Sequence, residues 1–291
     1  MNEELFDINN FNIIQDGEYY YFFRALNMAD NNDVDQGITI SQDGKINRIR
    51  TDRERFEGKA KYKEDSQISL EEVYDHIKMH YRKDTNCISI TSNSNVAINY
   101  GRVYYKDKYI MVKIPKKELG TTTFVAGKYL LKELYSKIMQ SIETLPQDKK
   151  QVILEIFNNI ENTKDSDTLK NIIQKKYTGK SKEISPNNTH LRKGIIYSSP
   201  KSRISSYQSL NDEQLLEVNK IYAKLAILEN EHILEHAIPH SRNSKLRETI
   251  GRAFSSFELI HYGEINKENI IEIPKEIMDI LALLQQMSKK T

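Results

Sequence analysis

The sequence has no tryptophan and only one cysteine, Cys87, among its 291 residues. A single cysteine excludes an internal disulfide and any metal site built from several cysteines. The seven histidines show no His-Glu-x-x-His spacing, so we do not expect a metal enzyme. No apolar run approaches the roughly 18 residues that a membrane span needs, and the first residues lack the basic and apolar regions of a signal peptide. We therefore expect a soluble protein that is made in the cytoplasm.

An excess of charge of one sign is also missing. Lysine and arginine number 43 and aspartate and glutamate 41, which leaves a formal net charge of +2. This balance argues against a mainly electrostatic nucleic-acid binder, and the tract from Arg192 to Arg203 is only mildly basic. A chain of this length can bury a full core as one large domain or two small ones.

Two short segments have the composition of buried strands. Residues 18–25 are aromatic and β-prone and place Arg24 near the end of the first predicted strand. An arginine after so apolar a run would be partly buried and would need an anion, and its fork geometry suits a diphosphate; a surface arginine at a strand end is the alternative. Residues 87–92 alternate in polarity, so that Ser89 and Thr91 would share one face of a second strand.

Other segments have helical periodicity. Ser69 with Glu72 forms a capping-box pattern that opens a helix to about Tyr81, and His76 lies on the same face as Val73. Further helices are predicted at about 128–143, 147–161, 167–175, 212–226 and 274–287. Residues 41–67 and 177–211 are predicted to be loops, residues 95–100 a short helix closed by Gly101, and residues 103–115 a hairpin.

Glu229 and Glu231 are the most prominent pair of acidic residues. In an extended segment both would point to one face, and their proximity would raise one pKa and divide their roles. In a helix they would diverge and could not cooperate. The apolar stripe Leu215, Val218, Tyr222 and Leu225 would next fall at Glu229 and His232, where the helical pattern fails. We therefore hypothesise an active-site strand here, with the helix as the open alternative.

The order of these motifs resembles that of the arginine-type mono-ADP-ribosyltransferases, particularly the cholera and pertussis toxin group. The family has an arginine on a first strand, a Ser-Thr-Ser strand and a later Glu-x-Glu. The local matches are Arg24-Ala25 with Asp33 and Gly37-Ile38 downstream, Val73-Tyr74-Asp75-His76, Ser89-Ile90-Thr91-Ser92 followed by Val96-Ala97, and Glu229-Asn230-Glu231 followed by Ile238-Pro239 and Ser241. Ile90 and Thr91 depart from the family pattern, which makes Ser89 the counterpart of the first serine unless the register centres on Ser92.

The resemblance covers roughly residues 18–115 and 215–245 and implies an α+β fold. Two packed antiparallel sheets would surround an NAD cleft within a single domain, residues 1–291. The long gap between the serine strand and Glu229 implies a helical insertion at about 120–211, and a helical segment at about 242–291 would follow the core.

The implied reaction splits the nicotinamide–ribose bond of NAD, the substrate, and transfers ADP-ribose to an arginine of a target protein. Glu231 would stabilise the oxocarbenium-like ribose, Ser89 would hold Glu231, and Glu229 would receive the acceptor guanidinium. The NAD-binding residues would be Arg24, His76, Thr91 and Ser92. All these side chains must converge on one site for the assignment to hold.

Three alternatives stay open at this stage. The acceptor could be nucleic acid, a small guanidino compound or water, the last of which would make the protein an NAD glycohydrolase. The chain could instead be an interaction protein whose residues 125–226 recognise a partner. The toxin resemblance also leaves open delivery into another cell, for which Cys87 is a poor tether because it opens a predicted core strand.

Overall fold

A computed structural model of the chain describes residues 1–25 (except 9, 10 and 12), 38–40, 46–48, 68–77, 87–104, 109–172 (except 166 and 170), 211–230 and 249–287 (except 251, 255, 264 and 266). Several predictions lie outside these described residues: Glu231, the connection 177–210, and Ile238-Pro239 with Ser241. No helix in the described part of the chain is both long and apolar enough to cross a membrane.

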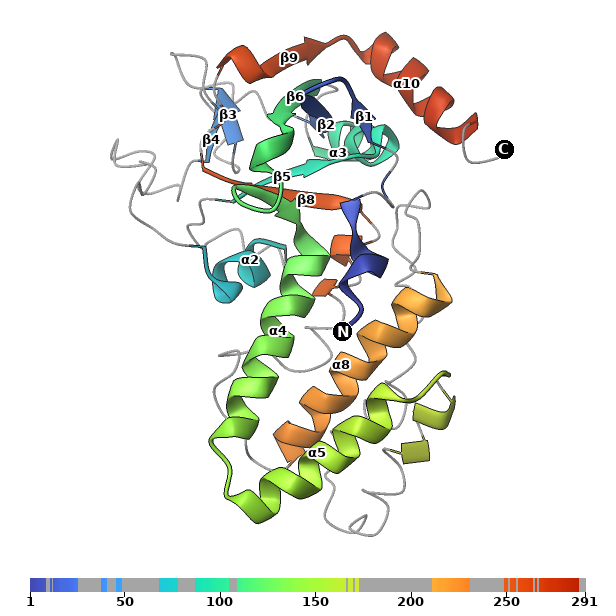
Figure 1. The fold of residues 1–291 in the computed structure, drawn as a ribbon. Coiled ribbons are helices and arrows are strands. Elements are labelled where there is room, and N and C mark those ends of the chain that lie inside the picture. Colours follow the sequence, from blue (N-terminus) through green and yellow to red (C-terminus); the bar gives the residue numbers. More distant parts are fainter. Residues whose placement is uncertain are drawn as a thin grey trace.

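An antiparallel sheet of seven strands forms the centre of an α+β fold (Figure 1). Hydrogen-bonded neighbours run in the order β7-β8-β5-β2-β6-β9, and β1 pairs separately with β2. The strands are β1 (Ile14–Gln15), β2 (Tyr19–Ala25), β5 (Cys87–Thr91), β6 (Tyr109–Pro115), β7 (Thr123–Val125), β8 (Glu258–Tyr262) and β9 (Ile270–Ile273). A second, two-stranded sheet joins β3 (Ile38–Ile40) to β4 (Ile46–Arg48). The coarse prediction of an α+β fold with antiparallel strands is confirmed.

The predicted strands at residues 18–25 and 87–92 form as β2 and β5, with nearly the expected bounds. Their β-branched and aromatic side chains fit a pleated, buried surface. Phe22 and Phe23 of β2 and Ile88 and Ile90 of β5 are all buried. β5 lies between β2, from the beginning of the chain, and β8, from near its end.

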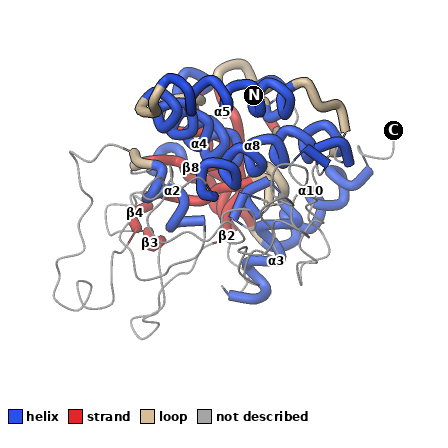
Figure 2. The backbone as a smooth tube through the Cα atoms, turned by 90° about the horizontal axis from the view of Figure 1, so that it is seen from below, coloured by secondary structure: helices blue, strands red, loops and turns tan. Residues whose placement is uncertain are grey.

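Helices cover both sides of the central strands. They are α2 (Leu70–Ile77), α3 (Ser94–Tyr104), α4 (Ala126–Glu143), α5 (Gln147–Glu161), α8 (Asp212–Asn230) and α10 (Lys275–Met287), with short 3-10 turns η1 (Glu3–Phe6), η3 (Lys116–Glu118) and η6 (Lys267–Asn269). Figure 1 shows α4, α5 and α8 grouped together, away from α3 and α10, and Figure 2 shows the same helices from below. The last helix begins and ends within a residue of its predicted range.

The helices α4, α5 and α8 lie between β7 and β8 in the sequence and pack together as one unit. Their shared core contains Leu130, Leu134, Ile138, Ile153, Phe157, Ile160, Val218, Ile221 and Leu225. Helices α4 and α5 lie within the range predicted as an insertion, 120–211, and α8, which follows that range in the chain, packs against both helices.

Three local predictions are wrong. Helix α3 runs through Gly101 to Tyr104, so the predicted hairpin at 103–115 is reduced to its second strand, β6. Gly101 is needed for packing inside the helix, because a Cβ there would lie 2.4 Å from the Tyr109 ring. β4 forms within the predicted loop 41–67, and the C-terminal segment 242–291 contributes two strands, β8 and β9, to the central sheet besides its helix.

A buried ion pair ties the N-terminus to α8. Lys220 Nζ lies 2.8 Å from Glu217 Oε1, with both side chains about nine-tenths buried. The backbone N–H of Asn2 donates to the other carboxylate oxygen of Glu217 at 3.2 Å. Burial by itself raises the pKa of Glu217, but the hydrogen bonds from Lys220 and Asn2 outweigh it and hold the pKa below its usual range.

We therefore expect part of the folding stability to disappear in acid. A carboxyl whose folded pKa lies below its unfolded pKa contributes stability above the unfolded value, and this is lost as the pH falls through the folded value. Glu217→Gln should lower the free energy of unfolding at neutral pH and reduce its decline toward about pH 4. Urea denaturation at several pH values measures both effects, with the exposed Glu155→Gln as control. Parallel acid profiles for wild type and Glu217→Gln would contradict the prediction.

Candidate active site

The candidate site lies where β2, β5 and β8 meet (Figure 1). Thr91 of β5 pairs with Phe23 of β2 on one side and with Glu258 of β8 on the other. Arg24 follows Phe23, and Ser89 stands two residues before Thr91. The register of three strands therefore brings Arg24, Ser89 and Glu258 to the same part of the sheet.

Ser89 and Glu258 are joined directly. The Ser89 hydroxyl donates a hydrogen bond to Oε1 of Glu258 at 2.6 Å. In the antiparallel ladder Ser89 stands opposite Ile260 and Glu258 opposite Thr91, so Ser89 and Glu258 are diagonal neighbours on the same face. The sheet itself, rather than a loop, positions this hydroxyl and this carboxylate.

Arg24 contacts the same strand from the other side. Its guanidinium Nη1 donates to the backbone carbonyl of Ser89. The side chain is partly buried at the end of β2, as its sequence position predicts. The Arg24 charge also acts on Glu258, whose pKa it lowers.

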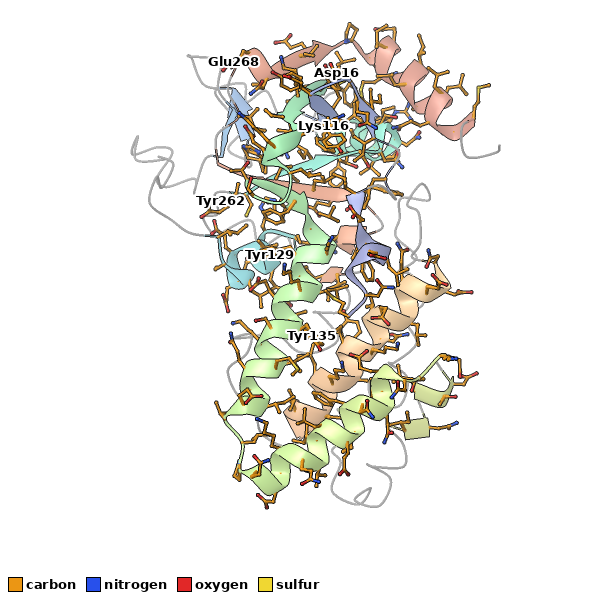
Figure 3. The ribbon with its side chains drawn as sticks, in the orientation of Figure 1. Asp16, Lys116, Tyr129, Tyr135, Tyr262 and Glu268 are labelled. Carbon is orange, nitrogen blue, oxygen red and sulfur yellow. The ribbon has the colours of Figure 1, made fainter. Side chains whose placement is uncertain are left out.

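His76 reaches the site from α2, and its Nε2 lies 2.7 Å from Ser89 Oγ. The helix begins as the capping box predicts, since the Glu72 backbone N–H donates to Ser69 Oγ at 3.1 Å. The Tyr262 hydroxyl of β8, labelled in Figure 3, donates to the Glu72 carboxylate at 3.3 Å. Helix α2 is thus tied to the same strand that carries Glu258.

Glu258 is the electrostatic centre of this group. Its side chain is only partly exposed, and burial raises its pKa above the usual glutamate range. The hydrogen bond from Ser89 and the positive charges of Arg252 and Arg24 lower the pKa without cancelling that rise. Carboxyl groups held between opposing influences of this kind are concentrated at functional sites.

The chain enters β8 through a residue in the left-handed region. Phe257 has a φ of 49°, which is uncommon for a residue with a bulky side chain. Its ring packs edge-on against Phe11, with centroids 5.4 Å apart. The Thr91 hydroxyl donates to the Ser256 carbonyl at 2.8 Å. These contacts fix the direction in which Glu258 leaves the turn.

Thr91 and Ser92, which the resemblance assigns to NAD binding, are both buried. Besides its bond to Ser256, the Thr91 hydroxyl accepts from the Asn93 backbone N–H at 3.1 Å. The Ser92 carbonyl accepts from the Gln285 amide of α10 at 2.9 Å. Both residues support the backbone around the site, and Ser89 is the serine that meets the carboxylate.

The predicted strand at Glu229–Glu231 is wrong where the structure describes it. Helix α8 continues through Asn230, so Glu229 is helical, and Glu231 lies outside the described residues. A helix covered on several sides does not need a single apolar stripe, so the break in the stripe at Glu229 does not end it. The buried apolar residues described in α8 are Val218, Ile221, Tyr222, Ala223, Leu225, Ile227 and Leu228.

Sequence reasoning misses Glu258 as a site residue. It lies in the middle of the run 254–262, and its local context, Ser256-Phe257-Glu258 before a β-prone stretch, is a weak signal. Its importance comes from the pairing of β5 with β8, which the local pattern does not specify. The convergence predicted for Arg24, Ser89 and Glu231 is therefore seen for Arg24, Ser89 and Glu258.

Comparisons of the chain with protein-family models, with curated proteins and with solved structures find no match. No known family decides its function. The chemistry has to be inferred from the arrangement of the site.

The contacts among His76, Ser89 and Glu258 differ from those of a serine hydrolase. In a hydrolase triad the histidine lies between the serine and the acid and removes the serine proton. Here the serine lies in the middle, and its hydroxyl donates a hydrogen bond to the acid. This order fits a carboxylate that is held in position to act on a substrate, rather than a serine activated as a nucleophile.

Proposed function

We propose that the protein cleaves the nicotinamide–ribose bond of NAD and transfers the ADP-ribose to an acceptor. The observation that carries this proposal is the hydrogen bond between Ser89 and Glu258 beside Arg24. An arginine, a serine and a serine-held glutamate are the groups that the resemblance to arginine-type mono-ADP-ribosyltransferases predicts. Glu258 takes the role that the sequence alone assigns to Glu231.

In this mechanism Glu258 stabilises positive charge on the ribose. The C1′–N1 bond breaks, its electron pair leaves with nicotinamide, and the ribose becomes oxocarbenium-like, as in glycoside hydrolysis. A preoriented carboxylate in a partly water-excluded site stabilises that charge more strongly than it could in water. Ser89 holds the carboxylate, and the Arg24 guanidinium binds the NAD diphosphate.

The ADP-ribose passes to a target-protein arginine or to water. An arginine acceptor needs a group that takes a proton from a guanidinium whose pKa exceeds about 12. The helical position of Glu229 removes the support for its role as that group. Ser256 stands two residues before Glu258, and its hydroxyl donates to the Arg252 carbonyl at 2.7 Å. A serine hydroxyl cannot serve as the base that an arginine acceptor needs, so water is a second candidate acceptor beside a target-protein arginine.

The test is incubation of the purified chain with adenine-labelled NAD, alone and with a cell lysate. We expect release of nicotinamide, with the label recovered on protein if arginine is the acceptor and as free ADP-ribose if water is. Ser89→Ala should slow nicotinamide release about tenfold, the value of one hydrogen bond to a charged group. Ser141→Ala is the matched control, because that hydroxyl donates to the Lys137 carbonyl within α4. Absence of NAD cleavage by the wild type in both conditions would refute the proposal, as would full activity of Ser89→Ala.

A further inference from the structure

The Ser89 hydroxyl has two partners in the candidate site. Its oxygen lies 2.6 Å from Glu258 Oε1 and 2.7 Å from His76 Nε2. A serine hydroxyl carries one proton and can donate only one hydrogen bond, while its oxygen can accept. When the serine proton lies in one of these two contacts, the bonds run either from His76 through Ser89 to Glu258 or in the reverse direction.

In the first arrangement His76 Nε2–H donates to Ser89, and Ser89 donates to an ionised Glu258. In the second, a protonated Glu258 donates to Ser89, and Ser89 donates to a bare Nε2. Only the first leaves Glu258 with the negative charge that can stabilise an oxocarbenium-like ribose. The tautomer of His76 is thus coupled through Ser89 to the charge state of the carboxylate.

We propose that His76 is a positioning residue whose Nε2–H commits the Ser89 proton to Glu258 and so keeps Glu258 in its charged, productive form. This deepens the proposed function, on which its catalytic consequence rests, and it changes the role of His76. The resemblance assigns His76 to orienting NAD, whereas here it acts on Glu258 through Ser89.

The position of α2 supports this role. Three buried residues, Val73, Tyr74 and Ile77, anchor the helix in the core beside His76. The Tyr262–Glu72 hydrogen bond links α2 to β8. The His76 imidazole is therefore held by the helix, and its Nε2 contacts Ser89 without a bound ligand to order the ring.

The tautomer can be measured without any activity. Long-range proton–nitrogen correlation spectra of the wild-type chain distinguish a protonated Nε2 from a bare one, and the His76 signals are assigned by their loss in His76→Gln. We expect a proton on Nε2 at neutral pH. A neutral ring with its only proton on Nδ1 would overturn the proposal whether or not the protein cleaves NAD.

Two substitutions test the catalytic consequence. His76→Gln retains an N–H donor near the Nε2 position and should keep the rate of NAD cleavage within about threefold of wild type. His76→Leu removes the donor and should lower that rate about tenfold, which corresponds to the free energy of one hydrogen bond. Glu71→Gln is the control for a loosened helix, since it breaks the 2.8 Å ion pair of α2 with Lys137 but leaves the contact with Ser89 in place. Equal activity of the Gln and Leu variants, or an equal loss in Glu71→Gln, would overturn the positioning role. Inactivity of the wild type would instead refute the proposed function and leave the tautomer measurement to decide this inference.

Discussion

Glu258→Gln should reduce NAD cleavage by about 100- to 1,000-fold, the usual effect of removing one electrostatic stabiliser of a transition state. Glutamine keeps the shape of the side chain and an oxygen that accepts from Ser89, so the loss would report the missing charge. The rate of nicotinamide release under saturating NAD measures the effect.

The same substitution should leave the fold at least as stable as the wild type. Burial raises the pKa of Glu258, so its ionised form costs folding free energy at every pH above its unfolded pKa. Replacing it by a neutral amide removes that cost, and calorimetry should show an equal or higher melting temperature at neutral pH. Lost activity with unchanged stability is the pattern that separates a functional carboxylate from a structural one.

Glu231→Gln and Glu229→Gln are the matched controls, because they make the same chemical change at the positions that the sequence alone favours. Both should cleave NAD at close to the wild-type rate. If Glu231→Gln eliminates cleavage and Glu258→Gln does not, the role passes back to Glu231. Near-wild-type activity in all three variants would remove the carboxylate mechanism altogether.

Glu161→Gln should destabilise the protein by about 3 kcal/mol, because it leaves a buried ammonium without its counter-ion. Lys224 of α8 is only 2% exposed and is paired with Glu161 of α5. Its ammonium also lies over the rings of Tyr135 and Phe157, 5.0 and 5.6 Å from their centroids. Tyr135 projects from α4 toward α8 in Figure 3. The ion pair and the ring contacts together therefore join α4, α5 and α8.

Urea denaturation of Glu161→Gln should show a lower midpoint than the wild type with a similar slope. The control is Glu143→Gln, which breaks the 2.5 Å pair with Lys150 where the glutamate side chain is 63% exposed. An exposed pair of that kind contributes at most about 1 kcal/mol. Equal effects of the two substitutions would show that the aromatic rings alone accommodate the Lys224 charge.

Local sequence patterns identify many of the elements that carry the site. The aromatic run of β2 places Arg24 near a strand end, the alternating run of β5 contains Ser89, and the capping box starts the helix that carries His76. Each of these three elements depends on residues close together in the chain, so propensity and periodicity are sufficient to predict it. The same holds for α4, α5 and α10, whose predicted bounds are nearly those of the structure.

The identity of the carboxylate could not be predicted in this way. The spacing of Glu229 and Glu231 suggests a pair of cooperating carboxylates, but residues two apart point to the same face only in a strand. Tertiary packing buries α8 on several sides and extends the helix past the point where its stripe ends. An amphipathic pattern describes a helix with one exposed face and does not apply to one that neighbouring helices surround.

By itself, the sequence determined the α+β composition, the order of most elements and three of the side chains that meet at the candidate site: Arg24, His76 and Ser89. The tertiary structure alone decided that Glu258 is the carboxylate they meet. Pairing between β5 and β8 joins segments more than a hundred residues apart, and it depends on the packing of the whole sheet rather than on local preferences.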